Sequence, residues 1–337
     1  MRKFALGTFS IRGAGAEKFA GLVVEGKVAP ISNLAEVYGK PELGGKSVLA
    51  LLDSWSTAFL ALNELVEKID ITEWYDESDL AFHPAVDLPR QIFCTGANYR
   101  KHVVDMTVDA NVGPEGLSKK ELKQWAEEMM DNRVANGEPY VFTKPVSAIS
   151  GPYDDLVLPP TTEKPDWELE LAVVIGKEGY NIREADAMDY VAGYTIVNDI
   201  SARDLIPRTD YKMLGTDWFR SKGQPGFLPL GPYVVPKCFI DNPYDLLMKL
   251  TVSGAVMQDE TSADMLFNIE KQIAYISKYA KLLPGDIICT GSPAGNGTHY
   301  NRYLSEGDVM VGEISGLGHQ RQKCVAGRTE AGHANAK

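Results

Sequence analysis

The sequence has few of the side chains that cross-link a fold or bind transition metals. Its 337 residues include only four cysteines and five histidines. No two cysteines form a Cys-x-x-Cys pair, and no two histidines have the His-x-x-x-His spacing of a zinc site. Scattered cysteines without a disulfide framework are typical of a reduced compartment, so we expect a cytoplasmic protein.

Long apolar runs and an excess of positive charge are also missing. No stretch approaches the ~18–20 consecutive apolar residues of a membrane span, and Met1–Gly7 lacks the apolar core of a secretion signal. Lysine and arginine number 34 against 46 acidic residues, which gives a formal net charge of −12. An acidic chain is poorly suited to bind nucleic acids or anionic membranes, so a small-molecule ligand is the better expectation.

The length and the local patterns indicate two unequal domains. A turn at Glu25-Gly26 predicts a hairpin, and apolar residues at helical spacing predict one continuous helix over 48–69. An acidic, proline-containing stretch that follows is a plausible boundary. We therefore predict a small N-terminal α/β domain over 1–85, a main domain over 86–325 and a loose tail over 326–337.

From residue 91 onward the pattern changes to short β runs separated by glycine and proline. Helical patterns are few between them, which argues against a doubly wound parallel sheet and favours a β-rich α+β fold. Segment 107–140 is an inserted helical segment, in which Ser118 and Glu121 predict a capping box before a helix over 118–133. The pattern leaves three roles open for this helix: a lid, an oligomer contact or an ornament.

Two carboxylates occur two residues apart in the strand pattern Asp166–Gly176. Alternation places Glu168 and Glu170 on the same face of that strand, ~6.5–7 Å apart. If that face is buried, both carboxylates stay ionised only with positive charge between them. A solvated strand face is the alternative, and the strand pattern alone favours it.

A third carboxylate, Asp199, follows another β run at Tyr194–Val197. Three hard oxygen ligands without a nearby histidine or cysteine favour Mg²⁺ or Mn²⁺, with water and substrate in the remaining positions. Asp199 therefore joins Glu168 and Glu170 in a candidate metal site.

A histidine and an aspartate form the next candidate pair. His102 and Asp105 lie three residues apart in a segment with a helical pattern, so they are neighbours on one helix face. A carboxylate beside a histidine orients the imidazole and favours its protonated form, which suits a general base that acts on water. Because a His-x-x-Asp pattern is common by chance, the spacing alone carries little weight.

These residues lie in stretches that resemble the fumarylacetoacetate hydrolase family, in particular its acylpyruvate hydrolase and 2-hydroxyhepta-2,4-diene-1,7-dioate isomerase members. The resemblance runs from about residue 91 to about residue 318, in several motifs in the right order. The similar stretches are Gly96–His102, Thr143–Ala148, Asp166–Gly176, Asp189–Asp204, Gln258–Phe267 and Pro284–Gly295. The resemblance implies that the main domain is a mixed β-sandwich roll.

The resemblance also implies roles for individual residues. The family's divalent-metal ligands match three carboxylates: Glu168, Glu170 and Asp199. Its catalytic histidine matches His102, while Asp105 stands where smaller members carry a glutamate, and its active-site lysine matches Lys222. The positions implied to bind substrate are Arg203, Thr290 and Tyr99.

The reaction implied by the resemblance is hydrolysis of a C–C bond in a 2,4-dioxo acid of the acylpyruvate kind. In that reaction His102 removes a proton from water, and Lys222 stabilises the developing oxyanion. Other members isomerise, hydrate, decarboxylate or join 2-oxo acids with the same metal, and an inactive scaffold is a further alternative. A homodimer is also expected, and the apolar stretch Met265–Ile269 is either its contact or part of the core.

Overall fold

The N-terminal strands form an antiparallel sheet around a two-residue turn. The computed structural model describes residues 2–13, 17–45 and 47–327. The sheet has the order β4-β3-β2-β1-β5. Its strands are β1 (Ala5–Ile11), β2 (Phe19–Val24), β3 (Lys27–Pro30), β4 (Tyr75–Asp76) and β5 (Leu80–His83). Glu25 and Gly26 join β2 to β3 with φ angles of 52° and 75°, which confirms the predicted hairpin.

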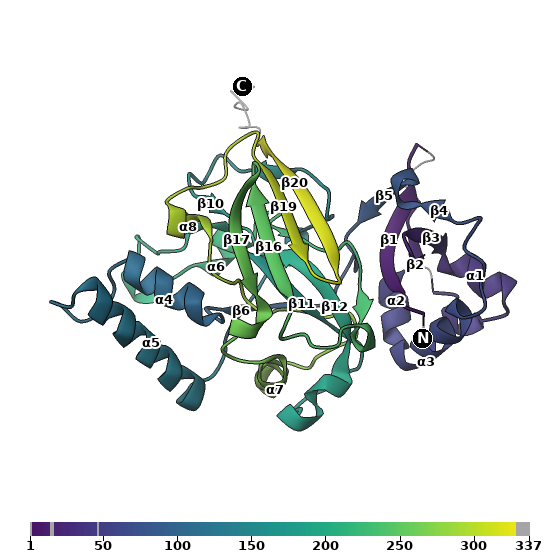
Figure 1. Ribbon diagram of the computed structural model, residues 1–337, viewed down its shortest axis with the longest axis horizontal. Helices are drawn as coiled ribbons and strands as arrows, with labels where there is room; N and C mark the ends of the chain where they lie inside the picture. Colours follow the sequence, from purple (N-terminus) through teal and green to yellow (C-terminus); the bar gives the residue numbers. More distant parts are fainter. Residues whose placement is uncertain (1, 14–16, 46, 328–337) are drawn as a thin grey trace, which may run out of the picture.

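Three helices pack against this sheet (Figure 1). They are α1 (Ile31–Val37), α2 (Val48–Asp53) and α3 (Trp55–Val66). The prediction of one continuous helix over 48–69 is wrong, because Ser54 takes φ −123° and ψ 36° and separates α2 from α3. The Ser54 carbonyl accepts hydrogen bonds from the N–H groups of Thr57 (3.0 Å) and Ala58 (2.9 Å), so the break costs little hydrogen bonding.

Two larger sheets form the main part of the chain. A six-stranded sheet has the order β15-β12-β11-β18-β6-β7, and a five-stranded sheet has the order β17-β16-β19-β20-β9. The six strands are β6 (Ile92–Gly96), β7 (Tyr140–Thr143), β11 (Leu169–Ile175), β12 (Val191–Asn198), β15 (Val235–Pro236) and β18 (Ile287–Cys289). The five are β9 (Leu156–Leu158), β16 (Leu247–Val252), β17 (Ala255–Thr261), β19 (Val309–Ile314) and β20 (Gly318–Ala326). Two short pairs complete the strands: β8 (Ile149–Ser150) with β14 (Leu228–Pro229), and β10 (Pro165–Asp166) with β13 (Ser201–Ala202).

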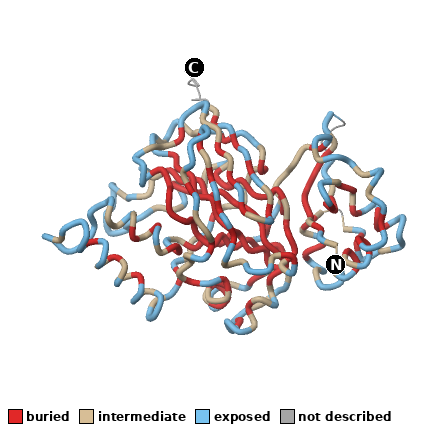
Figure 2. The backbone as a smooth tube through the Cα atoms, viewed as in Figure 1, coloured by how far each residue is buried: buried red, intermediate tan, exposed pale blue. Residues whose placement is uncertain are grey.

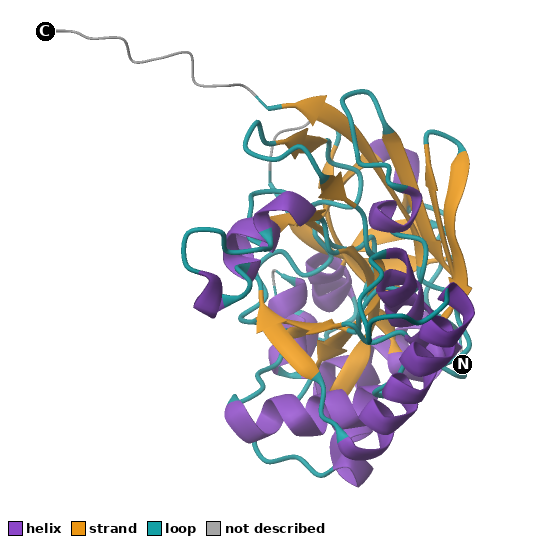
Figure 3. Cartoon of the chain, turned by 90° about the vertical axis from the view of Figure 1, so that its left-hand side faces the viewer, coloured by secondary structure: helices purple, strands orange, loops and turns teal. Residues whose placement is uncertain are grey.

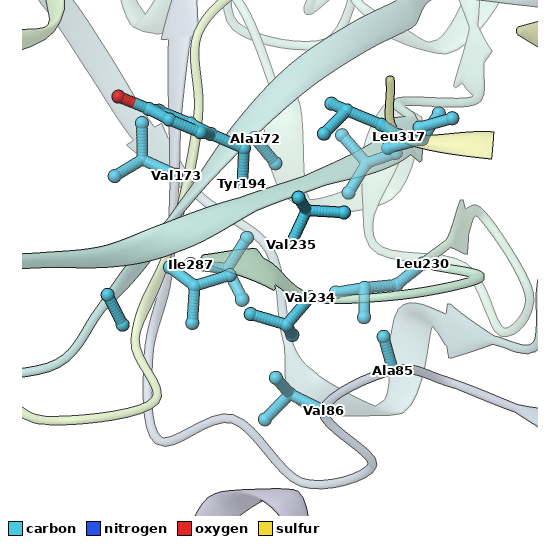
Figure 4. Close-up of a cluster of buried hydrophobic side chains, with 14 of the residues drawn as sticks. Ala85, Val86, Ala172, Val173, Tyr194, Leu230, Val234, Val235, Ile287 and Leu317 are labelled. Carbon is cyan, nitrogen blue, oxygen red and sulfur yellow. The ribbon is translucent and has the colours of Figure 1, made fainter. Parts of the chain in front are cut away.

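The two large sheets meet at β11 and β12, where every residue is buried (Figure 2). Gly312 of β19 lies against Leu169 of β11, since a Cβ at Gly312 would come within 2.7 Å of a Leu169 methyl carbon. The missing side chain thus allows the sheets to approach closely. Figure 4 shows part of the core, with Tyr194, Ile287 and Leu317 among its apolar side chains. This arrangement confirms the predicted α+β sandwich.

Five further helices flank the sheets of the main part. They are α4 (Arg100–Asp109), α5 (Lys119–Asn136), α6 (Trp218–Lys222), α7 (Ile269–Tyr279) and α8 (Gly297–Tyr300). Ser118 and Glu121 form the predicted capping box at the start of α5. Helix α5 packs on α4 through Val104, Ala126 and Met130, and lies at the end of the molecule opposite the N-terminal sheet (Figure 1). From the side, the strands lie mostly above the helices (Figure 3).

The division at residue 85 stays a prediction, because the N-terminal and main sheets share contacts. Leu6 of β1 and Val234 exchange two backbone hydrogen bonds, of 2.9 and 2.7 Å. The predicted tail begins too early, since Ala326 belongs to β20; residues 328–337 lie outside the described part of the chain. In the stretch proposed as a dimer contact, Phe267 and Ile269 are buried within the chain itself. Among the described residues, no helix is long and apolar enough to cross a membrane.

Candidate active site and metal centre

The predicted carboxylate triad comes together at the junction of β11 and β12. Antiparallel pairing places Leu169 opposite Asn198, so Glu168 and Glu170 flank the point where Asp199 follows its strand. One carboxylate oxygen from each lies within 4.8 Å of the others. Only 7% of Glu168, 2% of Glu170 and 1% of Asp199 is exposed, so the solvated strand face is excluded. The site is a buried cluster of hard oxygen ligands.

Two buried lysines neutralise part of this cluster. Lys222, at the end of α6, donates to Glu168 Oε2, to Asp199 Oδ2 and to Ser201 Oγ, each at 2.6 Å. Lys144 donates to Asp199 Oδ1 at 2.5 Å, and also to the carbonyls of Ile200 and Phe227. All three donors of Lys222 therefore have partners. Asp199 is held from two sides by ammonium groups.

An arginine and a fourth carboxylate extend the network. Arg203 donates through Nε to Asp166 Oδ2 at 2.7 Å and through Nη2 to Glu168 Oε1 at 2.6 Å. Asp166 is fully buried, and its Oδ1 also accepts from the Gly297 N–H at 2.6 Å. Because Gly297 begins α8, Asp166 joins Arg203 to that helix.

Glu170 differs from the other two members of the triad because it makes no ion pair in the described structure. Its Oε2 accepts from the Gly291 N–H at 2.8 Å. Burial, together with the charges of Asp199 and Glu168, raises the pKa of Glu170. Burial also raises the pKa of Glu168, but the positive charges of Arg203 and Lys222 outweigh this effect and hold the pKa well below its usual range. The donor set fits a divalent cation, which would supply the positive charge that Glu170 lacks.

His102 lies in the first turn of α4 and is 6% exposed. Burial is the main reason why the pKa of His102 falls to about 4; Arg203 and Lys222 lower it further, and Glu168 partly opposes them. The imidazole is therefore neutral near pH 7 and able to accept a proton.

Asp105 is not paired with His102. No hydrogen bond joins the two side chains in the described part of the chain, and Asp105 lines a separate hollow of about 170 Å³ together with Lys101, Glu260 and His299. The helix and the i, i+3 spacing are as predicted, but the helix is turned so that only His102 faces the carboxylates. The catalytic dyad of His102 and Asp105 is not formed in this arrangement and stays a prediction.

The carboxylates and His102 share one pocket of about 90 Å³. Its charged side contains the triad, Arg203 and Lys222, and its apolar side is made by Met106, Phe142 and Trp218. The Phe142 and Trp218 rings stack with centroids 5.2 Å apart, and Lys222 Nζ lies 5.3 and 5.8 Å from the two centroids. The pocket thus combines a polar wall with an aromatic one, as small-molecule sites do.

A family model described as fumarylacetoacetate (FAA) hydrolase C-terminal matches residues 91–325. The chain belongs to the fumarylacetoacetate hydrolase family. The chain is 35% identical over 265 residues, 78% of its length and 74% of the relative, to a human mitochondrial oxaloacetate tautomerase. It is 42% identical over 189 residues to a 2,4-didehydro-3-deoxy-L-rhamnonate hydrolase of Sphingomonas, over 55% of this chain and 65% of the relative.

Solved structures of similar proteins share the fold of this chain. A maleylpyruvate hydrolase from Sphingobium, solved with manganese(II) and pyruvate, is 23% identical and superposes with a TM-score of 0.69. The superposition covers 96% of this chain and all of that one, so it includes the N-terminal sheet. The human relative is named as mitochondrial, and the cytoplasmic location expected here stays a prediction.

Two of the residues that the family resemblance implies to bind substrate do not line the pocket of this chain. Tyr99 is fully buried, and its hydroxyl lies 3.7 Å from Met248 Sδ. The Thr290 hydroxyl donates to the Leu171 carbonyl at 2.8 Å. Arg203 does line the pocket, so of the three residues it is the one placed to meet a ligand. The roles of Tyr99 and Thr290 stay predictions.

Several residues of the site were not predicted from the sequence, and those with polar side chains include Lys144, Asp166, Ser201 and Ser292. Lys144 and Asp166 lie within stretches that resemble the family, yet alternation and spacing say nothing of their partners. A lysine between Thr143 and Pro145, directly after a β run, was the one available signal, since a lysine is rarely buried unless it is paired.

Proposed function

We propose that this chain is a Mg²⁺- or Mn²⁺-dependent enzyme that cleaves a C–C bond in a short 2,4-dioxo acid by hydrolysis. One observation carries the proposal: a neutral, buried His102 faces the same pocket as a buried carboxylate triad. General-base attack of water on a carbonyl group that a metal ion polarises needs both features in one place. The Sphingomonas hydrolase, the relative with the higher identity of the two, supports the reaction class.

Glu168, Glu170 and Asp199 would hold the metal, with Lys144 and Lys222 fixing the orientation of two of these ligands. When bound, the ion would polarise the 2-oxo group and stabilise the negative charge that develops there. With all four carboxylates ionised, the site has one more negative charge than Lys144, Lys222 and Arg203 balance. A divalent cation would reverse that sign and favour an anionic substrate.

His102 performs the proton transfer in this mechanism. Its neutral imidazole takes a proton from water, and the resulting hydroxide attacks the C4 carbonyl of the substrate. The bond between C3 and C4 then breaks, its electron pair stays on C3, and a proton completes the methyl group of pyruvate. The remaining carbons leave as a carboxylic acid, so one water molecule is consumed in each turnover.

Arg203 supplies the contact with the substrate carboxylate. Two of its five N–H donors are bonded to Asp166 and Glu168, which leaves three for a ligand in the pocket that it lines. Lys222 has no donor to spare, so its contribution is to position Glu168 and Asp199 and to raise the local positive potential. A water molecule occupies ~30 Å³, so a pocket of about 90 Å³ favours a short acyl group.

Oxaloacetate keto–enol tautomerisation is the second candidate. The specific observation in its favour is that no carboxylate is hydrogen-bonded to His102 among the described residues, and the charge of Glu168 only partly offsets the lowering of the His102 pKa. Tautomerisation moves a proton between C3 and an oxygen and needs no activated water. The human relative carries the name of that activity.

Acetylpyruvate and oxaloacetate distinguish the two candidates. Turnover of each is measured with Mg²⁺, with Mn²⁺ and after EDTA treatment, with acetate release as the readout for cleavage and loss of the enol absorbance as the readout for tautomerisation. We expect metal-dependent release of acetate and pyruvate from acetylpyruvate in equal amounts. Turnover of oxaloacetate alone would replace hydrolysis with the second candidate, and no metal-dependent turnover of either compound would overturn both.

A further inference from the structure

The inserted helix α5 contacts the wall of the pocket through one side chain. Arg133, in the last turn of α5, donates to the carbonyl of Ala97 and, at 3.5 Å, to that of Gly96. Gly96 and Ala97 line the pocket, whereas the described pocket lining contains no residue from 107–140. In this arrangement α5 braces the pocket from outside and does not cover it as a lid.

The segment that Arg133 contacts has an unfavourable backbone conformation. Ala97 has a φ of +52°, in the left-handed region that residues with a side chain seldom adopt. An alanine has no polar side-chain atom with which to stabilise such a turn. The hydrogen bonds from Arg133 to the carbonyls of Ala97 and Gly96 therefore help to keep the turn in this shape.

The two carbonyls also determine where the neighbouring N–H groups point. In a trans peptide the N–H lies opposite the C=O, so the N–H of Ala97 opposes the Gly96 carbonyl and the N–H of Asn98 opposes the Ala97 carbonyl. The structure gives neither N–H group an acceptor among the residues that it describes. Ala97 lines the pocket, whereas neither Asn98 nor Arg133 does, so the N–H of Ala97 is the one on the pocket side.

Further contacts fix the relative positions of the turn and the inserted helix. Asn98 is bonded on both sides of its amide to the backbone of Phe267, at 2.9 and 3.1 Å, and the Arg133 guanidinium lies 5.2 Å from the centroid of the Phe267 ring. Arg100 of α4 makes a bidentate ion pair with Asp131 of α5, at 2.6 and 3.1 Å. The helix that carries His102 and the turn of the wall are thus both attached to α5.

We propose that Arg133 is a positioning residue through which the inserted helix shapes the substrate site. It holds the carbonyls of Gly96 and Ala97 so that the N–H of Ala97, a residue of the pocket wall, can donate to an anionic oxygen of the substrate. The inference rests on the proposed function only in requiring a small carboxylate ligand. It assigns the inserted segment a role in ligand affinity.

Arg133→Gln tests this proposal, with Lys123→Gln as the matched control. Both changes remove one positive charge from α5, and Lys123 is exposed and makes no contact with the wall. Mn²⁺ affinity is measured first by titration calorimetry, and the affinity for oxalate is then measured on the Mn²⁺-loaded protein. We expect Arg133→Gln to weaken oxalate binding by ~10-fold, the usual worth of a hydrogen bond to a charged group, while Mn²⁺ binding stays unchanged. Lys123→Gln should match the wild type in both titrations.

A second substitution separates positioning from a general structural defect. Glycine adopts positive φ as readily as negative φ, so Ala97→Gly in the Arg133→Gln background should recover part of the lost oxalate affinity. Arg133→Lys keeps the charge but lacks the planar guanidinium group that donates to both carbonyls. Its oxalate affinity should therefore lie between those of the wild type and Arg133→Gln.

Three outcomes would overturn the proposal: equal oxalate affinity in Arg133→Gln and Lys123→Gln, an equal loss of Mn²⁺ and oxalate affinity in Arg133→Gln, or no recovery on adding Ala97→Gly. Oxalate binding involves no turnover, so the proposal survives if the assigned reaction is wrong. Conversely, a wild-type enzyme that hydrolyses acetylpyruvate while Arg133→Gln binds oxalate normally would refute this inference alone.

Discussion

The two sides of the pocket are built in different ways. On one side, the carboxylates belong to two fully buried strands or lie directly next to them: Glu168 precedes β11, Glu170 lies within it and Asp199 follows β12. Lysines or backbone groups hold their oxygens. On the other side, His102 and Met106 belong to α4, a helix that packs against the inserted helix α5 and against loops. The strand side is fixed by the sheet itself, while the helix side depends on what packs behind it.

This difference indicates which side sets the chemistry and which sets the ligand. Charges buried between two sheets cannot move without breaking several ion pairs at once, so we expect the carboxylate side to keep the same arrangement for any substrate. A helix attached by a few side chains tolerates substitution and length changes far better. We therefore expect substitutions on the strand side to abolish the reaction, and substitutions on the helix side to reduce its rate only in part.

The largest expected effect comes from the triad. Glu170→Gln and Asp199→Asn should each weaken Mn²⁺ binding by at least ~100-fold and abolish turnover. Their effects on the metal-free protein should be opposite. Asp199→Asn leaves Lys144 and Lys222 short of a counter-charge and should cost ~3 kcal/mol of unfolding free energy, whereas Glu170→Gln removes a repelling charge and should stabilise. Calorimetry and urea unfolding in EDTA measure both; stability shifts of the same sign would contradict the comparison.

His102→Ala should have the next largest effect. Hydrolysis of acetylpyruvate should fall by ~10²–10⁴, the usual worth of general-base catalysis. Any decarboxylation of oxaloacetate should fall less, because loss of CO₂ needs no activated water. Both rates are measured on the same preparation of enzyme. If the two activities fall equally, His102 serves binding or folding, and it has to be removed from the proton-transfer step.

Buried His102 should also make the fold sensitive to acid. Its pKa is about 4 in the folded chain, below the ~6.5 of an exposed histidine, so between these values the unfolded chain binds a proton that the native chain does not. Stability should therefore fall as the pH drops from about 6.5 to 4, by on the order of 3 kcal/mol from this group. Urea unfolding at pH 7.5, 6.0 and 4.5 checks it, and His102→Gln should show a correspondingly shallower loss.

Asp105→Asn should have the smallest effect. Because Asp105 lines a different hollow from His102, its substitution should change hydrolysis by no more than about 2-fold, as for an ordinary surface position. Asp105→Glu serves as the companion variant, since a longer side chain has a better chance of reaching the imidazole. A loss in Asp105→Asn that approaches the loss in His102→Ala would show that α4 rotates during turnover and forms the dyad.

The strand side of the pocket could be predicted from the sequence largely because β alternation is a strict rule. Side chains two residues apart in a strand pattern share one face, so Glu168, directly before β11, and Glu170 within it were expected to lie together. Whether that face was buried could not be read from alternation, and the resemblance to the family decided it. The cations that make burial possible come from Lys144 and Lys222, which are 55 and 23 residues away from Asp199 along the chain.

The helix side could be predicted less well. Helical spacing correctly makes His102 and Asp105 neighbours, but it does not determine which way the shared face is turned. That rotation depends on the packing of Val104 against Ala126 and Met130 of α5. The break between α2 and α3 at Ser54 is a similar case, because the apolar stripe continues across it without interruption.

The contact between Gly291 and Glu170 has a consequence for synthesis of the chain. The N–H of Gly291 that holds the Glu170 carboxylate lies 121 residues further along the sequence. Strand β18, which pairs with β11, ends two residues before Gly291. At ~5–20 residues per second, a ribosome needs roughly 6–24 s to make that stretch. During this time the seven apolar-rich residues of β11 have an unpaired edge that can join another nascent chain. This unpaired edge therefore exists before the carboxylate cluster is complete, and we expect that added metal ions cannot protect the chain during that time.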